Sequence, residues 1–296
     1  MVLAWVVVRK MLRIAKSYRI TSIADFIASR YGKSPTLAGL VTLITVVGII
    51  PYIALQLKAV SVGYAVMTTL PGSSPAPVGD WWNDNTLYFA LALAAFTVVF
   101  GARRLDVSEQ HQGMVAAIAF ESIIKLLAFL AVGIFVTYSL FDGMGDIFDR
   151  ARAVPEIASL FGNAGTFDYG QWFSLTLLAM LSVVLLPRQF QIMVVENVDE
   201  RHLRRAAWVF PAYLLLINIF VLPVAIGGLL LFGSGTMDPE AFVLSLPLAS
   251  GQHALALLAF IGGLSAATGM VIVEAIAVSS MVCNDLVMPL LLRTRR

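Results

Sequence analysis

The sequence predicts an all-α protein that crosses a membrane several times. Hydrophobic residues make up 59% of the chain and charged residues only 13%, against about 25% in a typical soluble domain. The apolar residues form long continuous runs instead of alternating with polar ones, which indicates helices and excludes the strands of a membrane barrel. Most of the 20 Lys and Arg residues fall in every second connection between these runs. The lipid bilayer is therefore the first expected partner.

Six apolar runs are the predicted spanning helices, because about 20 mainly apolar residues are needed to cross about 30 Å of hydrocarbon. They are residues 37–67, 87–100, 113–140, 172–186, 206–232 and 254–292. The second and fourth runs are short, so we expect interfacial aromatic residues such as Trp82 and Tyr169 to extend them. An apolar start, MVLAWVVV, before Arg9 predicts one further partial helix.

The basic connections orient the chain, since short loops rich in Lys and Arg stay in the cytoplasm. Basic residues gather in residues 9–33, 103–104, 188–205 and 293–296, whereas residues 71–86 and 233–252 contain none and residues 142–171 contain only Arg150 and Arg152. This pattern predicts a cytoplasmic position for Arg103, Arg201 and Arg295 and an external position for Gly79, Phe161 and Ser250.

Two connections predict short amphipathic helices. Residues 20–32 carry a cytoplasmic one, which Thr21 or Ser22 can cap, with Asp25 completing a capping box with Ser22. Residues 147–160, interrupted by Pro155, form an external one. The external stretch either covers the mouth of a cavity or lies on the bilayer surface.

Several classes of chemistry are excluded by composition. A single cysteine, Cys283, and three scattered histidines give no metal-ligand spacing. No phosphate-binding loop, hydrolase or kinase signature occurs, and the basic residues are explained by cytoplasmic loops. We therefore expect no catalytic residue, no metal site and no nucleic-acid partner in these 296 residues.

Five stretches resemble motifs of the sodium:solute symporter family. ITSIADFIASRYG resembles the cytoplasmic motif after the family's third helix, and PYIALQLKAVS resembles its fourth helix. SEQHQG stands where the family has a motif at the start of its sixth helix. LPRQFQIMVVENVD is similar to the end of the seventh helix, and GGLSAATGMVIVEAIAVSSMVCNDLV to the ninth. The resemblance covers essentially the whole chain.

Three stretches resemble more narrowly the membrane portion of sensor histidine kinases that carry a symporter-type domain. They are HQGMVAAIAFESIIKLLAFLAVG, LPRQFQIMVVENVDERHLRRAAW and SSMVCNDLVMPLLLR. The implied function is the sensory or transport input module of a two-component kinase in a bacterial inner membrane. The alternatives are part of a stand-alone secondary carrier for a small organic solute such as an amino acid, and a truncated relic that serves neither role.

The implied fold consists of two inverted five-helix repeats with solute and ion sites at the midplane. Residues 1–296 would form a single domain of this partial LeuT-like fold, from the end of core helix 2 through core helix 8. The charge order at the start does not fit a signal peptide, and the chain stops directly after a membrane exit. We therefore expect a fragment cut at both ends, with helices and a possible kinase domain lying outside it.

The resemblance also implies solute-binding residues. Tyr52 aligns with a tyrosine in the substrate cavity of the family's amino-acid carriers, although a tyrosine in a membrane helix is often simply packed. Gln56, one turn on, faces the same way. Pro187 aligns with a proline near the end of the seventh helix, but Ala179 and Val183 replace the aromatic residues of the proline carriers. A pocket of stacked rings is not expected.

The coupling ion is either Na⁺ or H⁺. Alignment places the family's sodium ligands at Ala266, Gly269 and Met270, and neither glycine nor methionine offers a side-chain oxygen. Thr268 or Ser265 could substitute if the helix were rotated.

Four ionisable residues lie inside apolar runs, where an unpaired charge costs at least about 2.5–3.5 kcal/mol. They are Lys58, Glu121, Lys125 and Glu274. Glu121 and Lys125 are four residues apart and predict a structural ion pair. Glu274 is the candidate for proton coupling, with a paired structural charge as the alternative. Glu109 aligns with an acid at the cytoplasmic mouth, where it either serves coupling or simply favours a helix start.

Overall fold

The computed structural model describes residues 2–68, 85–101, 112–162, 169–235 and 237–294. Within these residues every regular element is a helix and no strand occurs, which confirms the all-α class. The predictions for Gly79, Arg103, Glu109 and Arg295 fall on residues outside these described ranges.

Four helical spans in the described residues are long and apolar enough to cross a membrane. They are α3 (Pro35–Thr68), α5 (Gln112–Phe135) with η2 (Val136–Leu140), α10 (Glu200–Ile219) with α11 (Val221–Phe232), and α13 (His253–Met281) with η5 (Val282–Val287) and α14 (Met288–Thr294). These spans match the first, third, fifth and sixth predicted runs. The protein is therefore a polytopic membrane protein.

The two shorter runs behave differently from the other four. The fourth run forms α8 (Tyr169–Leu185), which joins α9 (Pro187–Phe190) and η3 (Gln191–Val195) through a bend of 47° and makes a fifth span if the pair is counted as one. The second run forms α4 (Asn85–Gly101), whose apolar part is shorter than a spanning helix. The structure thus supports four or five spans where the sequence predicts six.

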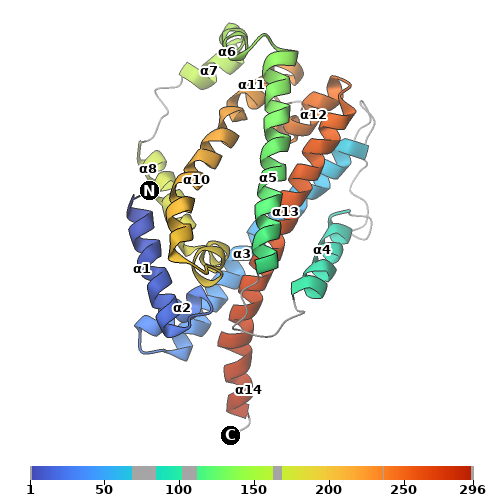
Figure 1. The fold of residues 1–296 in the computed structure, drawn as a ribbon. Coiled ribbons are helices and arrows are strands. Elements are labelled where there is room, and N and C mark those ends of the chain that lie inside the picture. The colour runs from blue at the N-terminus through green and yellow to red at the C-terminus, as the bar shows by residue number, and fades with distance from the viewer. Residues whose placement is uncertain (1, 69–84, 102–111, 163–168, 236, 295–296) are drawn as a thin grey trace.

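Helix α13 runs through the middle of the bundle and packs along α5 and α3 (Figure 1). Small residues allow the close approach: a Cβ atom at Gly262 would lie 2.7 Å from the Ala128 Cβ atom on α5. Membrane helices commonly pack through such small residues, because apolar burial alone does not drive helices together in lipid. This packing brings the middle of α13 against both α5 and α3.

One end of the bundle carries the described basic segments. Helices α1 (Val2–Tyr18) and α2 (Ile23–Arg30) lie there together with α14 (Figure 1). Arg9 and Arg13 both pair with Glu200 at the start of α10, and the Lys16 ammonium donates to the Val198 carbonyl at 2.7 Å. Most of the described basic residues therefore lie at this end, with Arg150 and Arg152 of α6 (Met144–Ala153) at the other. The side of the membrane that the basic end faces stays a prediction.

The capping prediction for α2 is confirmed at Ser22. The Ser22 hydroxyl accepts a hydrogen bond from the Asp25 amide at 3.0 Å. The Asp25 carboxylate reaches back to the Thr21 amide at 3.3 Å, one residue earlier than a regular capping box requires. The helix ends at Arg30, just before Gly32, whose φ of 68° favours glycine.

The opposite end is closed by short helices (Figure 1). The predicted amphipathic stretch forms α6 (Met144–Ala153) and α7 (Pro155–Gly162), which are separated at Val154 because proline disfavours a helical residue before it. Ile147 and Ala151 are fully buried against η2 and α11. The stretch therefore packs onto the bundle, as do η4 (Pro239–Ala241) and α12 (Phe242–Ala249) beside it.

Candidate functional site

The chain breaks between α8 and α9, and Arg188 just after the break points its charged side chain into the bundle. Pro187 is the first residue of α9, and Leu186 before it is extended, with φ −67° and ψ 133°. Proline cannot continue a preceding helix, but it fits the first turn of a new one, where its missing amide would have had no partner. The resulting 47° bend places α9 against α13.

Arg188, the next residue, joins three helices. Its Nη1 atom donates to the Tyr52 hydroxyl on α3 at 2.7 Å. Its Nε atom lies 4.0 Å from the Glu274 Oε2 atom on α13, and only 14% of its side chain is exposed. Tyr52 and Glu274 both lie near the middle of their helices, so the guanidinium sits well inside the bundle.

Glu274 is almost completely buried, with 2% of its surface exposed. Its Oε2 atom faces Arg188, whereas its Oε1 atom has no hydrogen-bond partner among the described residues. A buried carboxylate oxygen without a partner is costly, because it has lost its water and gained nothing in exchange. Such an atom is free to take a proton or a ligand.

Tyr52 connects Arg188 to Met270, one of the positions that the predicted alignment matches to a sodium ligand. The tyrosine hydroxyl accepts from Arg188 and donates to the Met270 sulfur at 3.0 Å. The side chain at position 270 is therefore occupied by a hydrogen bond to α3 and supplies no oxygen ligand. This contact links the predicted solute residue to α13.

A second acid, Glu121 on α5, lies against Gly269 on α13. A Cβ atom at position 269 would collide with the Glu121 carboxylate. Lys125, one turn along α5, acts on Glu121 through space, as does Arg188 from α9. Glu121 and Lys125 interact electrostatically but form no ion pair within 4.0 Å among the described side chains.

We call Arg188, Glu274, Glu121, Lys125 and Tyr52 the central cluster. It contains two acids and two bases, so it is neutral when all four are ionised. The Tyr213 hydroxyl on α10 lies nearby and donates to the Ser122 carbonyl on α5 at 3.3 Å. Charges at this depth of a membrane protein are typical of ion and solute pathways.

The structure brings some predicted residues together and leaves others apart. Tyr52 and Glu274 both face Arg188, which directly follows Pro187 at the break, and Gln56 is half-buried one turn from Tyr52. Lys58 lies on an exposed face of α3 instead of joining the cluster. Ala266 is half-buried on α13, and the Thr268 hydroxyl donates to the Leu264 carbonyl of its own helix at 2.8 Å.

Arg188 is the residue of the central cluster that the sequence alone did not single out. Its position after an apolar run and before further arginines assigned it to a cytoplasmic basic loop. Two signals could have found it: the proline directly before it, which predicts a break, and Glu274, an intramembrane acid that lacked a basic partner on its own helix.

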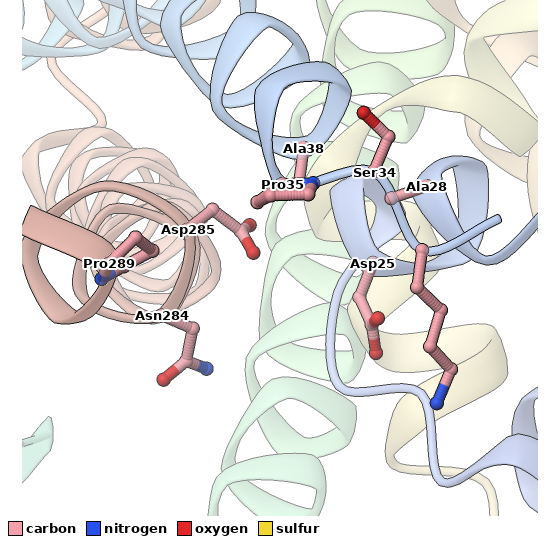
Figure 2. A pocket seen from close by; sticks show the side chains of 9 residues that line it. Asp25, Ala28, Ser34, Pro35, Ala38, Asn284, Asp285 and Pro289 are labelled. Carbon is pink, nitrogen blue, oxygen red and sulfur yellow. The ribbon is translucent and has the colours of Figure 1, made fainter. Parts of the chain in front are cut away.

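A small pocket is lined by residues of α2, the start of α3, η5 and α14. Figure 2 shows the side chains around it. Its volume is about 170 Å³, and Asp25 and Asp285 both line it. The buried Thr42 hydroxyl donates to the Asp285 carboxylate at 3.1 Å. No group of three or more His, Cys, Asp or Glu residues that could hold a metal occurs among the described residues.

Comparison with known proteins supports a transport protein. No protein-family model and no solved structure matches the chain. The chain is similar to the "Uncharacterized symporter YhjB" of Bacillus subtilis (strain 168), with 26% identity over 218 residues, which are 73% of this chain and 40% of that protein. The chain thus spans less than half the length of this relative. Together with its apolar helices, this similarity makes the chain a symporter-like, multi-pass membrane protein.

Proposed function

We propose that the chain is the solute- and ion-handling part of a secondary carrier of the sodium:solute symporter type. The observation that carries this proposal is the buried contact between Arg188 and Glu274 at a helix break. Broken helices at the centre of a transporter form binding sites, because their free backbone groups and the nearby charges face a cavity instead of lipid.

A proton is the coupling ion that the residues favour. Gly269 and Met270 stand where the resembled family has hydroxyl ligands for sodium, and neither offers a side-chain oxygen, while the Thr268 hydroxyl is engaged with its own helix. Glu274 instead presents a buried oxygen with no described partner, which a proton can occupy. Proton relays in membrane transporters use buried acids of this kind.

The solute in this proposal is a small organic molecule, with an amino acid as the first candidate. Tyr52, Gln56 and the backbone next to Pro187 would line its path, since they surround the break from α3 and α9. The membrane would be a bacterial inner membrane, with the basic end of the bundle in the cytoplasm.

The input module of a sensor histidine kinase is the second candidate. It rests on the three stretches that resemble such proteins, whereas the curated relative is described as a symporter and favours transport. The DNA around the coding sequence separates the two. A histidine-kinase sequence after residue 296 would favour the sensor, and further membrane helices followed by a stop codon would favour the carrier.

The carrier is tested by uptake into membrane vesicles that contain the complete gene product. The solutes are a panel of labelled amino acids and small organic acids, offered with a pH gradient or a sodium gradient. We expect uptake of at least one solute that follows the pH gradient and is unchanged when choline replaces sodium. Glu274→Gln should abolish the pH dependence, whereas the exposed control Glu240→Gln should not.

Two results would contradict the proposal. Absence of uptake for every solute would remove the carrier function. Strong sodium dependence, or unchanged pH-driven uptake in Glu274→Gln, would remove the proton from the coupling step and return Glu274 to a structural role.

A further inference from the structure

We infer that Arg188 is the receptor for a carboxylate group of the transported solute, and that Glu274 competes with the solute for it. This inference rests on the proposed carrier function and names the class of its substrate. It is carried by the hydrogen bonds, burial and charge balance around Arg188.

The Arg188 guanidinium is not saturated by the partners that the structure gives it. A guanidinium has five N–H donors in a planar fork, and Arg188 gives one strong hydrogen bond, to the Tyr52 hydroxyl at 2.7 Å. Its approach to Glu274 is 4.0 Å, whereas a charge-assisted hydrogen bond is about 2.7–2.9 Å long. The fork therefore retains the capacity to bind a second carboxylate in the bidentate geometry that arginine prefers.

Tyr52 holds this fork in position. Its ring centroid lies 5.4 Å from the central carbon of the guanidinium, and its hydroxyl is fixed in turn by Met270. Tyr52 thus orients the guanidinium but, being neutral, does not compensate its positive charge. With only 14% of the side chain exposed, the surroundings are poor in water, and a hydrogen bond to a charged group is stronger there.

Glu274 has the features of a competitor for the guanidinium. A carboxylate that served only as a structural partner of Arg188 would bring both oxygens into close contact, since the pair must repay the desolvation of two buried charges. Here the carboxylate interacts with the Arg188 backbone amide, its Oε2 atom lies 4.0 Å from the guanidinium Nε atom, and its Oε1 atom has no hydrogen-bond partner among the described residues. Glu274 is therefore placed to neutralise Arg188 when the solute is absent.

The charge balance couples the solute to a proton. Glu274 faces Arg188 from α9. Arg188 in turn contacts Tyr52 from α3 and lies within electrostatic range of Glu121 and Lys125 from α5, and Tyr213 from α10 lies near Glu121. With both acids ionised the cluster is neutral, so a solute carboxylate adds one negative charge. A proton on Glu274 restores neutrality and frees the guanidinium for the solute. One carboxylate and one proton then enter together.

The inference is tested by ligand-dependent thermal unfolding of the purified complete gene product in detergent. The probes are the amino acids and the two- to six-carbon mono- and dicarboxylic acids, each compared with its amide at pH 5.5 and pH 7.5. We expect at least one acid to raise the unfolding temperature, more strongly at pH 5.5, while its amide does not. A panel in which no acid binds, or in which acid and amide bind equally, would overturn the inference.

Variants assign the effect to the two residues. Arg188→Gln should weaken binding of the acid by about tenfold to a hundredfold, as expected for the loss of a hydrogen bond to a charged group. Arg188→Lys keeps the charge but loses the fork, so it should recover only part of the affinity. Glu274→Gln should make binding independent of pH between the two values. Arg150→Gln on α6, at the opposite end of the bundle, is the matched control. It should change neither the affinity for the acid nor the pH dependence of its binding.

The double variant Arg188→Gln/Glu274→Gln guards against a simple loss of folding, because removing both partners leaves no unpaired charge. It should unfold cooperatively and bind no acid, and retained binding would overturn the inference. Uptake separates the two proposals. Transport of a neutral solute that survives Arg188→Gln would remove the carboxylate receptor and keep the carrier. Binding of an acid without uptake of any solute would keep the carboxylate receptor and remove the carrier function.

Discussion

The Glu121 carboxylate on α5 occupies the space that a side chain at position 269 of α13 would fill. An acid inside a membrane-spanning helix thus lies directly on the backbone of α13, at a position that the predicted alignment matches to a sodium ligand of the resembled family. Glycine at 269 is required by this contact, and the requirement can be tested without knowledge of the solute.

Gly269→Ala should lower the unfolding temperature in detergent, because its methyl group collides with the Glu121 carboxylate and displaces it. Gly263→Ala on the same helix is the matched control, since its Cβ atom meets no other atom within 4 Å. Alanine favours a helix by roughly 0.5–1 kcal/mol over glycine, so the control should be neutral or stabilising. Adding Glu121→Ala should rescue Gly269→Ala. Equal effects of the two glycine substitutions would contradict the contact.

Topology is tested by cysteine labelling in intact cells. The exposed Cys283 is first replaced by serine, and single cysteines are introduced at Phe161, Ser250 and Arg201. An impermeant maleimide should label positions 161 and 250 from outside and position 201 only after the cells are permeabilised. Labelling of position 201 in intact cells would reverse the orientation that the basic residues predict.

The spans could be predicted from the sequence because hydrophobicity over a long window is a direct physical requirement of the bilayer. The predicted run 113–140 ends where η2 ends, and the run 206–232 ends where α11 ends. The cap at Ser22 was also predictable, since it depends only on residues within one turn. Local chemistry and membrane thickness together account for these elements.

The central cluster could be predicted only in part. Glu274 and Tyr52 were recognisable as a buried acid and a mid-helix tyrosine, but their common partner Arg188 depends on the direction of a 47° bend. The contact between Glu121 and Gly269 depends on how closely two helices approach, which no single helix encodes. Lys58 lies inside a predicted span, but which face of α3 carries it depends on how that helix packs, and in the structure its side chain is exposed.

The pH dependence of stability has a predictable contribution from α6, which lies outside the spans. Arg150 donates a hydrogen bond to Asp146 at 2.8 Å and lowers the pKa of that carboxyl below its usual value of 3.8. A lowered pKa in the folded state stabilises the fold above the unfolded value, and the contribution disappears as the pH falls through the folded value. Asp146→Asn should therefore lower the unfolding temperature slightly at pH 7.

The difference between Asp146→Asn and the unmodified chain should shrink steadily as unfolding is measured at pH values falling below 4. Asp149→Asn is the control, because Asp149 and Arg152 form a longer contact of 3.5 Å with both side chains more than two-thirds exposed. A control that matches Asp146→Asn at every pH would show that the Arg150 contact contributes nothing specific.

The most direct test of the account is a double-mutant cycle on Arg188 and Glu274, read as free energies of unfolding in mixed micelles. Each single change to glutamine leaves a buried charge without its partner and should cost about 3–5 kcal/mol. If the two residues form one electrostatic unit inside the bundle, the double variant should lose at least about 1 kcal/mol less than the sum of the single losses. For the control pair Arg150→Gln and Glu274→Gln, the loss of unfolding free energy in the double variant should equal the sum of the single losses within about 0.5 kcal/mol. Additive losses for Arg188 and Glu274 would show that they do not meet, and the proposed site would fall with them.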